Sequence, residues 1–329
     1  MSPGEGRPAQ GEIGRILLVK LRAIGDAVLT LASLEALHRG FRGAAVTVLC
    51  PPASVPVYAG DPRCRDVWAY ERRGPGGLAA QAALFGRVRR AGFDLVVCLH
   101  ASFRTALIAR LSGARWRSVR NHSGPDWFCN LRATEPKEPK SIIQRDFDAL
   151  RACGLKPVEG RLRMFIPAAA RAAARRRFKG WHLRGRAVIL FPGAGKPEKR
   201  WPLDRFAALG AGLKALRRTP VFLGAPGEQP LDALARSVGG RADQVADLKE
   251  LGALCALAGA VVGNDSGPRH VAAACGARTF TLFGPEGLRE WQPYRREDGH
   301  WALQAPTRRI EDLPLGDVES ALKSWLGGA

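Results

Sequence analysis

Long apolar runs are missing from this sequence of 329 residues. No stretch approaches the roughly 20 consecutive apolar residues that cross a bilayer, and residues 1–14 are polar, without the apolar centre of a secretory signal. Internal repeats of solenoid length are missing too. These absences argue against a membrane-spanning protein and a repeat array, and we expect a globular protein of the cytoplasm.

Paired cysteines are also missing. The seven cysteines are an odd number and are scattered from Cys50 to Cys275 without any Cys-x-x-Cys pair, so neither a disulfide framework nor a zinc knuckle is indicated. His270 has no second His or Cys at the spacing of zinc ligands. We therefore expect buried thiols in a reducing compartment and predict no metal site.

Acidic residues are few relative to basic ones. The chain has 51 Lys and Arg against 30 Asp and Glu, which gives a net charge of +21. Such an excess favours an anionic partner: nucleic acid, an acidic membrane surface or a phosphorylated glycolipid. A solvated surface that is merely rich in arginine is the alternative, and net charge alone does not choose among these.

Short apolar runs alternate with helical patterns along the chain. Residues 15–19 form an almost wholly apolar run, as in a central parallel strand. Apolar residues at three-residue steps predict a helix over residues 27–39, and residues 46–49 return as a strand. A similar series starts at residue 187. Two such series with right-handed crossovers predict an α/β protein with two Rossmann-like, doubly wound parallel-sheet domains that face a central cleft.

The domain boundary is expected near Pro167, which precedes a basic helix rich in alanine and arginine. We predict a disordered N-terminus over residues 1–14, an N-terminal domain over residues 15–166 and a C-terminal domain over residues 167–329. The last helix is left free to pack back on the N-terminal domain.

The most informative motif is the turn Asp265-Ser266-Gly267-Pro268, with a predicted strand before it and a helix after it. Proline is tolerated in the first turn of a helix because the N–H that it lacks has no partner there. The turn is therefore expected at a helix N-terminus, where free N–H groups and the helix dipole suit a phosphate or pyrophosphate. An ordinary helix cap is the alternative.

A glycine-rich loop follows another predicted strand, at Pro192-Gly193-Ala194-Gly195. Three cations, Lys196, Lys199 and Arg200, lie within five residues of the same loop. Pro197 stands where a P-loop needs Ser or Thr, so we reject a nucleoside triphosphatase. A positively charged loop of this kind suits a pyrophosphate leaving group.

Acidic residues at three places are candidates for chemistry. Asp26 stands after the first predicted strand and before a helix, where it could accept a proton from a substrate hydroxyl or simply cap the helix. Glu228 also follows a strand and could hold ribose hydroxyls or be a solvated turn residue. Asp146-Phe147-Asp148 matches the Asp-x-Asp that binds metal in some sugar transferases, but it lies in an amphipathic helical stretch, so we place it on the surface.

Together these motifs resemble the lipopolysaccharide heptosyltransferase family, glycosyltransferase family nine. They occur in the family's order and extend from about residue 15 to residue 295. The matching segments are residues 16–20 with 24–26, residues 192–193 with 199–202, residues 224–228, and residues 263–270 with 283–285. Arg269 and the pair Arg22-Ala23 depart from the residues that are common there, which puts the identity of the acceptor in doubt.

The resemblance implies a GT-B fold in which the first domain holds the acceptor and the second holds a nucleotide sugar, typically ADP-heptose. It also implies inverting transfer with no metal ion and no cofactor besides this donor. By similarity, Asp26 is the general base, and Lys199 stabilises the departing diphosphate with the N–H groups of Ser266 and Gly267. Asp265 is similar to the family's donor-sugar aspartate, and Glu228 to its ribose ligand. The other expected donor-binding residues are Gly193, Lys196, Pro268 and His270.

The expected acceptor is an anionic glycolipid, the lipid A and Kdo core, at the cytoplasmic face of the inner membrane. Arginines of the first domain are where we expect it to bind, although exposed solubilising arginine is the alternative for each of them. They are Arg72, Arg73, Arg104, Arg117 and Arg120. We expect a monomer that is peripheral to the membrane and does not bind nucleic acid.

Two other functions remain open at this point. A nucleotide-sugar epimerase shares the two-domain architecture. A non-catalytic nucleic-acid-binding protein would use the charge of +21, but the sequence has no helix-turn-helix, RNP or zinc-finger pattern.

Overall fold

The computed structural model describes residues 6–71, 77–120, 128–132, 140–157, 162–183, 186–228 and 231–327. It consists of two compact units, Met1–Gly160 and Arg161–Ala329. Each unit has its own parallel sheet and its own hydrophobic core. In the part of the chain that is described, no helix is both long enough and apolar enough to cross a membrane.

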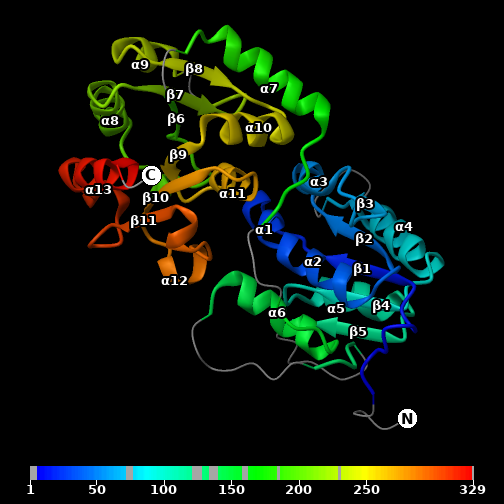
Figure 1. Ribbon diagram of the computed structural model, residues 1–329. Helices are drawn as coiled ribbons and strands as arrows, with labels where there is room; N and C mark the ends of the chain where they lie inside the picture. The colour runs from blue at the N-terminus through cyan, green and yellow to red at the C-terminus, as the bar shows by residue number, and fades with distance from the viewer. Residues whose placement is uncertain are drawn as a thin grey trace. The chain divides into compact units, whose positions relative to one another are not determined.

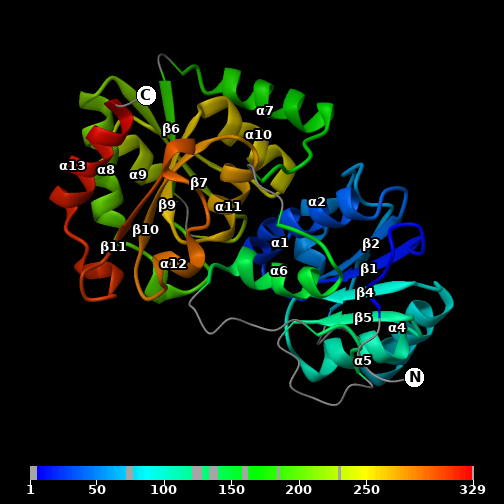
Figure 2. The same cartoon turned by 60° about the horizontal axis from the view of Figure 1, so that its bottom comes forward.

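The first unit contains a five-stranded parallel sheet in the order β3-β2-β1-β4-β5 (Figure 1). Its strands are β1 (Arg15–Val19), β2 (Ala45–Cys50), β3 (Asp66–Ala69), β4 (Leu95–Cys98) and β5 (Trp116–Val119). Its helices are α1 (Ile24–Leu29), α2 (Leu31–Gly40), α3 (Val55–Tyr58), α4 (Gly77–Arg90), α5 (Phe103–Leu111) and α6 (Ile142–Ala152). Helices α1, α2 and α6 cover one face of the sheet, and α4 and α5 cover the other (Figure 2). Strand β1 lies in the middle and is buried from both faces, which explains its uninterrupted apolar run.

The N-terminal segment is held against the first unit over the residues that are described. The N–H groups of Gly14 and Arg15 donate to the Asp94 carboxylate at 2.9 and 2.8 Å, and Ile13 is buried. Ile13 and Gly14 are therefore packed against the first unit where disorder was expected, and residues 1–5 lie outside the described part.

The second unit contains a six-stranded parallel sheet in the order β11-β10-β9-β6-β7-β8. Its strands are β6 (Arg186–Phe191), β7 (Arg218–Gly224), β8 (Arg241–Gln244), β9 (Ala260–Asn264), β10 (Arg278–Phe283) and β11 (His300–Gln304). Its helices are α7 (Ala168–Gly180), α8 (Leu203–Ala215), α9 (Asp232–Ser237), α10 (Leu248–Ala258), α11 (Gly267–Ala274), α12 (Leu288–Trp291) and α13 (Leu315–Gly327). Helices α7, α10 and α11 lie on one side of the sheet, and α8, α9 and α13 lie on the other (Figure 2).

The boundary between the units differs from the expected position after residue 166. The Met164 N–H donates to the Ala274 carbonyl at the end of α11, 2.9 Å away, and Met164 and Ile166 are buried. The segment before Pro167 therefore belongs to the second unit.

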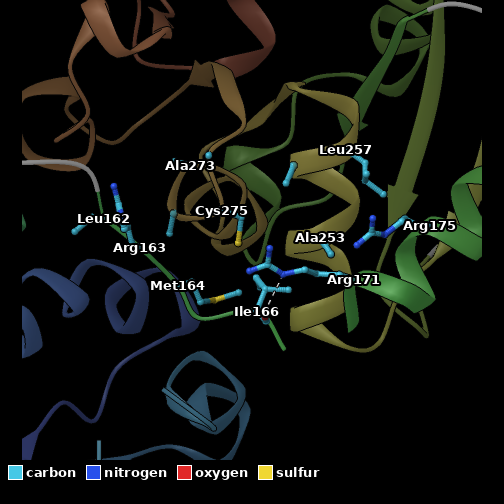
Figure 3. A pocket seen from close by; sticks show the side chains of 13 residues that line it. Leu162, Arg163, Met164, Ile166, Arg171, Arg175, Ala253, Leu257, Ala273 and Cys275 are labelled. Atoms are coloured by element: carbon cyan, nitrogen blue, oxygen red, sulfur yellow. Dashed lines mark hydrogen bonds between the residues drawn. The ribbon is translucent and has the colours of Figure 1, made fainter. Parts of the chain in front are cut away.

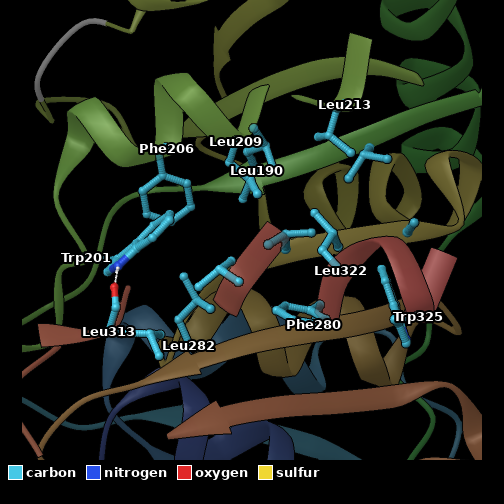
Figure 4. Close-up of a cluster of buried hydrophobic side chains, with 14 of the residues drawn as sticks. Leu190, Trp201, Phe206, Leu209, Leu213, Phe280, Leu282, Leu313, Leu322 and Trp325 are labelled. Carbon is cyan, nitrogen blue, oxygen red and sulfur yellow. Dashed lines mark hydrogen bonds between the residues drawn. The ribbon is translucent and has the colours of Figure 1, made fainter. Parts of the chain in front are cut away.

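The core of the second unit anchors the loop that follows β6 (Figure 4). The Trp201 ring packs edge-on against Phe206 with 5.2 Å between ring centroids, and its Nε1 donates to the Leu313 carbonyl at 2.9 Å. The last helix, α13, adds Leu322 and Trp325 to the same core. This helix, which the sequence left free to pack on the first domain, packs on α8 of the second unit.

Both sheets have a topological switch point, where the chain order reverses between neighbouring strands. It lies between β1 and β4 in the first unit and between β6 and β9 in the second. Ligands of doubly wound sheets bind beyond the carboxyl ends of the strands at such a point. The residues that follow β1 and β4, and β6 and β9, are therefore the places to look for a site.

Candidate active site

Asn264, at the end of β9, joins the two loops at the switch point of the second unit. Its side-chain Oδ1 accepts from the Trp201 N–H at 3.1 Å, and its Nδ2 donates to the Pro192 carbonyl at 2.7 Å. Gly263 is required beside it, because a Cβ atom there would lie 2.8 Å from the Cβ atom of Phe191. These contacts fix the loop that carries Lys199 against the turn that carries Asp265.

Lys199 is the central cation of this arrangement. Its Nζ lies 2.8 Å from Oδ2 of Asp265 and 3.1 Å from Oε1 of Glu286, which follows β10. Burial lowers the pKa of Lys199, but its hydrogen bonds and charge interactions with the two carboxylates outweigh this and raise the pKa above its ordinary value. Lys199 is therefore an ammonium ion at neutral pH, with two of its three N–H bonds directed at carboxylates.

Arg269 holds the other oxygen of the Asp265 carboxylate. One of its Nη atoms lies 2.8 Å from Oδ1 of Asp265, and the other donates to the Gln292 side chain at 2.8 Å. The Arg269 side chain is only 1% exposed. Asp265 thus has one cation on each oxygen, which fixes the direction of its carboxylate. From the sequence, Arg269 was noted only because it departs from the residues that are common at this position in the family, and no role was predicted for it.

His270, expected among the donor-binding residues, is enclosed in the fold beside Arg269. Its Nε2 lies 2.8 Å from a guanidinium nitrogen of Arg269, and its Nδ1 lies 2.6 Å from the Tyr294 hydroxyl. Burial, with the charges of Arg269 and Lys199, lowers the pKa of His270 far below its usual range. The ring is neutral, and because a guanidinium only donates, Nε2 accepts and Nδ1 carries the proton.

The turn after β9 leads into the amino end of α11. Ser266 is the N-cap residue and Pro268 lies in the first turn, as expected from the sequence. The Ser266 side chain does not cap the helix, and its Oγ is buried without a hydrogen-bond partner among the described residues. The first N–H groups, from Gly267 onward, have no partners within the helix, so this end of α11 suits an anion.

Glu228, after β7, lies over the backbone of Gly193, after β6. A Cβ atom on Gly193 would come within 2.9 Å of both Glu228 carboxylate oxygens, so only glycine fits there without displacing the carboxylate. Oε2 of Glu228 also accepts from the Ala225 N–H at 2.9 Å. Lys196 is separate from these groups: its side chain is 64% exposed and its ammonium lies 3.9 Å from the Glu198 carboxylate.

In the first unit, Asp26 is the third residue of α1 and lies near the buried Lys20. The distance from Lys20 Nζ to the Asp26 carboxylate is 3.7 Å. Lys20 is 1% exposed and donates to both oxygens of Asp146 at 3.0 and 2.7 Å. Arg120 adds a third cationic contact, to Oδ1 of Asp146 at 3.1 Å. Asp26 thus stands at the edge of a buried ion-pair network.

The surface position expected for Asp146 and Asp148 is wrong. Asp146 is 0% exposed, and burial raises the pKa of its carboxyl, with Lys20 and Arg120 acting in the opposite direction. Asp148 is also buried, and its carboxylate pairs with Lys140 at 2.7 Å. Helix α6 therefore turns both carboxylates inward, because cations meet them there. Asp146 meets Lys20 and Arg120 from distant parts of the unit, whereas Asp148 meets Lys140, just before the helix, and Arg151, on the helix itself. Among the described residues, no group of three metal-ligating side chains occurs.

A cavity of about 940 Å³ lies beyond the carboxyl ends of β1 to β4 in the first unit. Arg104 lines it and donates to the Tyr70 hydroxyl at 2.9 Å. Arg22, which the sequence marked only as a departure, lines it as well, as do His100 and the exposed Phe103. Cations beside aromatic rings are suited to an anionic sugar.

Two of the other arginines expected at the acceptor are described by the structure, and neither of them lines this cavity. Arg117 donates instead to the carbonyls of Ala114 and Phe128, at 2.6 and 3.3 Å. Arg120 is engaged with Asp146. Arg72 and Arg73 lie outside the described residues.

His100 gives this cavity a measurable pH signature. Burial lowers the pKa of His100 to about 4, helped by the charges of Arg22, Lys20 and Arg120. Because the unfolded chain takes up the proton near pH 6.5 and the folded chain does not, stability falls as the pH drops from 6.5 towards 4. Replacing His100 by Gln should remove up to about 3 kcal/mol of this loss. The free energy of unfolding, obtained from urea denaturation at pH 7 and at pH 4.5 for wild type and variant, measures this difference. The exposed His38, replaced in the same way, is the control; an equal effect of both substitutions would contradict the assignment.

Known proteins match the chain in sequence and in fold. Residues 81–312 match the family model described as glycosyltransferase family 9 (heptosyltransferase). Lipopolysaccharide heptosyltransferase 3 of Escherichia coli is 24% identical over 339 residues, covering 93% of this chain and 97% of that protein. The glycosyl transferase family 9 protein of Veillonella parvula DSM 2008 has a TM-score of 0.81 at 20% identity, covering 96% of this chain and 98% of that one. For the E. coli heptosyltransferase WaaC with ADP, the TM-score is 0.74 at 16% identity, with 94% and 99% covered.

The likeness to these structures extends over both parallel-sheet units and confirms the GT-B fold expected from the sequence. The family model covers well over half of the chain, from α4 through the whole of the second sheet. It includes the loop of Lys199, the turn of Asp265 and Glu228. The chain therefore belongs to glycosyltransferase family 9, the heptosyltransferases.

Proposed function

We propose that the protein is an inverting glycosyltransferase that moves a heptose from an ADP-heptose-type donor to an anionic inner-core lipopolysaccharide acceptor. Membership of the family supports heptose transfer in lipopolysaccharide synthesis. The solved relative that contains ADP supports the nucleotide. The observation that carries the proposal is the Lys199 ammonium, 2.8 Å from Asp265 at the switch point of the second sheet.

In the proposed donor site, the diphosphate lies at the amino end of α11. Two N–H bonds of Lys199 are directed at Asp265 and Glu286, and the third donates to a phosphate oxygen. The N–H groups of Ser266 and Gly267 add to this, together with the positive end of the helix dipole. The Glu228 carboxylate accepts from the ribose hydroxyls. Asp265, held by Arg269, accepts from hydroxyls of the sugar.

The reaction is a single displacement. The Asp26 carboxylate takes the proton of the acceptor hydroxyl while its oxygen forms a bond to the anomeric carbon. The bond from that carbon to the diphosphate oxygen breaks, and its electron pair leaves with ADP. Lys199 stabilises the charge that develops on the leaving oxygen. We propose that this ammonium does the work that a metal ion does elsewhere, so that no metal and no further cofactor takes part.

The first unit is proposed to hold the acceptor in its cavity of about 940 Å³. Arg22 and Arg104 are the cations for its acidic groups, and Tyr70 and Phe103 offer apolar ring faces to its sugars. An acceptor of this kind is anchored in a membrane, whereas the donor is water-soluble. The proposed place of reaction is therefore the cytoplasmic surface of the inner membrane.

Product analysis tests the proposal directly. The full chain is incubated with ADP-heptose and a heptose-deficient lipopolysaccharide, with and without EDTA. We expect the acceptor to gain the mass of one heptose under both conditions, with the anomeric configuration opposite to that of the donor. UDP- and GDP-sugars serve as controls and should be poor donors. An altered donor sugar that forms without any acceptor would instead identify an epimerase.

A further inference from the structure

A cavity of about 510 Å³ lies in the second unit, at the opposite end of α11 from Ser266 (Figure 3). It is bounded by α7, α10, the carboxyl end of α11 and residues 162–166. Its volume lies within the range of about 300–1,000 Å³ that is usual for small-molecule sites. The proposed donor and acceptor sites do not use any of its lining residues.

The floor of this cavity is apolar and is made of small side chains. Ala253, Ala273 and Ala274 are buried there, beside Met164 and Ile166. Alanines on α10 and α11 leave room that larger side chains would fill. The cavity therefore offers a hydrocarbon chain a surface from which water is readily displaced.

The mouth of the cavity is cationic. Arg163, Arg171 and Arg175 line it, and none of the 13 described residues around it is acidic. The Nε of Arg171 donates to the Ile166 carbonyl at 3.1 Å, which holds its guanidinium at the opening. The ends of α10 and α11 each contribute only about half a negative charge, so three arginines leave the opening positive.

The surface around the opening continues the same pattern. Arg171, Arg175 and Lys179 are exposed and, at four-residue spacing, share one side of α7. Two large apolar side chains are exposed nearby in the same unit: Leu257, which lines the cavity, is 44% exposed, and Phe165 is 39% exposed. Cations next to exposed apolar groups are characteristic of surfaces that rest on a bilayer.

We propose that this cavity binds an anionic phospholipid at a bilayer surface. The arginines pair with the lipid phosphate, and part of one hydrocarbon chain lies over the alanine floor. The arginines at the opening argue against a purely apolar ligand. The apolar floor argues against free phosphate, which has no hydrocarbon chain to lie over it. This inference extends the proposed function by giving the second unit its own contact with the membrane that carries the acceptor.

Cosedimentation of the full chain with vesicles tests this, without donor or acceptor. The chain should bind vesicles of phosphatidylcholine with phosphatidylglycerol, and bind vesicles of phosphatidylcholine alone far more weakly. The partition coefficient of the double variant Arg171→Glu/Arg175→Glu should fall at least about 30-fold. This factor corresponds to the loss of two arginine contacts with the anionic surface, each of which contributes about 1 kcal/mol. Ala256→Phe fills the cavity at its exposed edge without changing charge. The partition coefficient of this variant should fall at least about tenfold, because about two methylene groups of the lipid chain would no longer be buried.

The matched control is Lys214→Glu/Arg236→Glu, which changes net charge equally at exposed positions outside the cavity. It should stay within about threefold of the wild type, because charges beyond a Debye length are screened. Equal losses in both double variants, or wild-type binding by Ala256→Phe, would overturn the proposal, as would binding of duplex DNA in place of vesicles. The cosedimentation contains no substrate, so its result does not depend on heptose transfer. Vesicle binding by a chain that transfers no heptose in the product analysis would refute the proposed function and leave this inference standing.

Discussion

Replacing Asp26 by Asn is expected to abolish heptose transfer while the protein still folds and binds ADP. Asparagine has the same shape but cannot take the proton of the acceptor hydroxyl. General-base catalysis contributes about 10²- to 10⁴-fold, so turnover should fall by at least about 10². Asp26 is on α1 in the first unit, and the proposed nucleotide site is formed wholly by residues of the second. Transfer rates and calorimetric titration with ADP separate the two effects.

The control for Asp26 is Glu35→Gln on the neighbouring helix α2. It also turns a carboxylate into an amide, and it removes pairing with Arg39 and Arg63 without touching the cavity of the first unit. Its turnover should stay near that of the wild type. If Asp26→Asn kept more than a tenth of wild-type turnover, another group would have to be the base.

Replacing Lys199 by Met should lower kcat about 10²- to 10³-fold, the usual effect of removing one group that stabilises charge on a leaving oxygen. KM should change less, because the leaving charge is greatest in the transition state. The neighbouring carboxylates raise the pKa of Lys199 above its ordinary value of 10.5, so its ammonium persists through mildly alkaline pH. Deprotonation of Lys199 should therefore not lower the wild-type rate below about pH 10.

The control for Lys199 is Lys214→Met, an exposed lysine on α8 that contacts none of the proposed donor-binding residues. Steady-state kinetics of the two variants at saturating acceptor measure the difference. A rise in KM at unchanged kcat for Lys199→Met would mean that Lys199 binds the donor equally in the ground state and has no special role in the departure of ADP.

The sequence predicted well what depends on local pattern. The uninterrupted run at β1, the turn before α11 and the loop after β6 lie where strand and helix signals place them. The paired domains follow because two such series admit few other folds. The resemblance to family nine is confirmed by the family match, while the roles of individual residues stay predictions.

Ion pairs between residues that are far apart in the chain could not be predicted from the sequence. Lys20 and Asp146 are 126 residues apart, and only the packing of α6 near the end of β1 brings them together. An Asp in an amphipathic helix is normally solvated, so the surface prediction followed the usual pattern and was wrong. Arg269 was missed as a partner of Asp265 for a different reason. The turn that carries Asp265 leads directly into the first turn of α11, which permits the contact, but the burial of Arg269 depends on Gln292 and Trp291 from a later segment.

The cluster around Lys199 is electrically balanced before any donor arrives. Lys199 and Arg269 offset Asp265 and Glu286, so four charged groups sum to about zero in a protein whose net charge is +21. Long-range attraction of an ADP-sugar from solution then comes from the rest of the surface, and the selectivity of the pocket comes from short-range geometry. Donor recognition at this cluster should therefore tolerate a wide range of ionic strength, whereas contact with an anionic membrane should not.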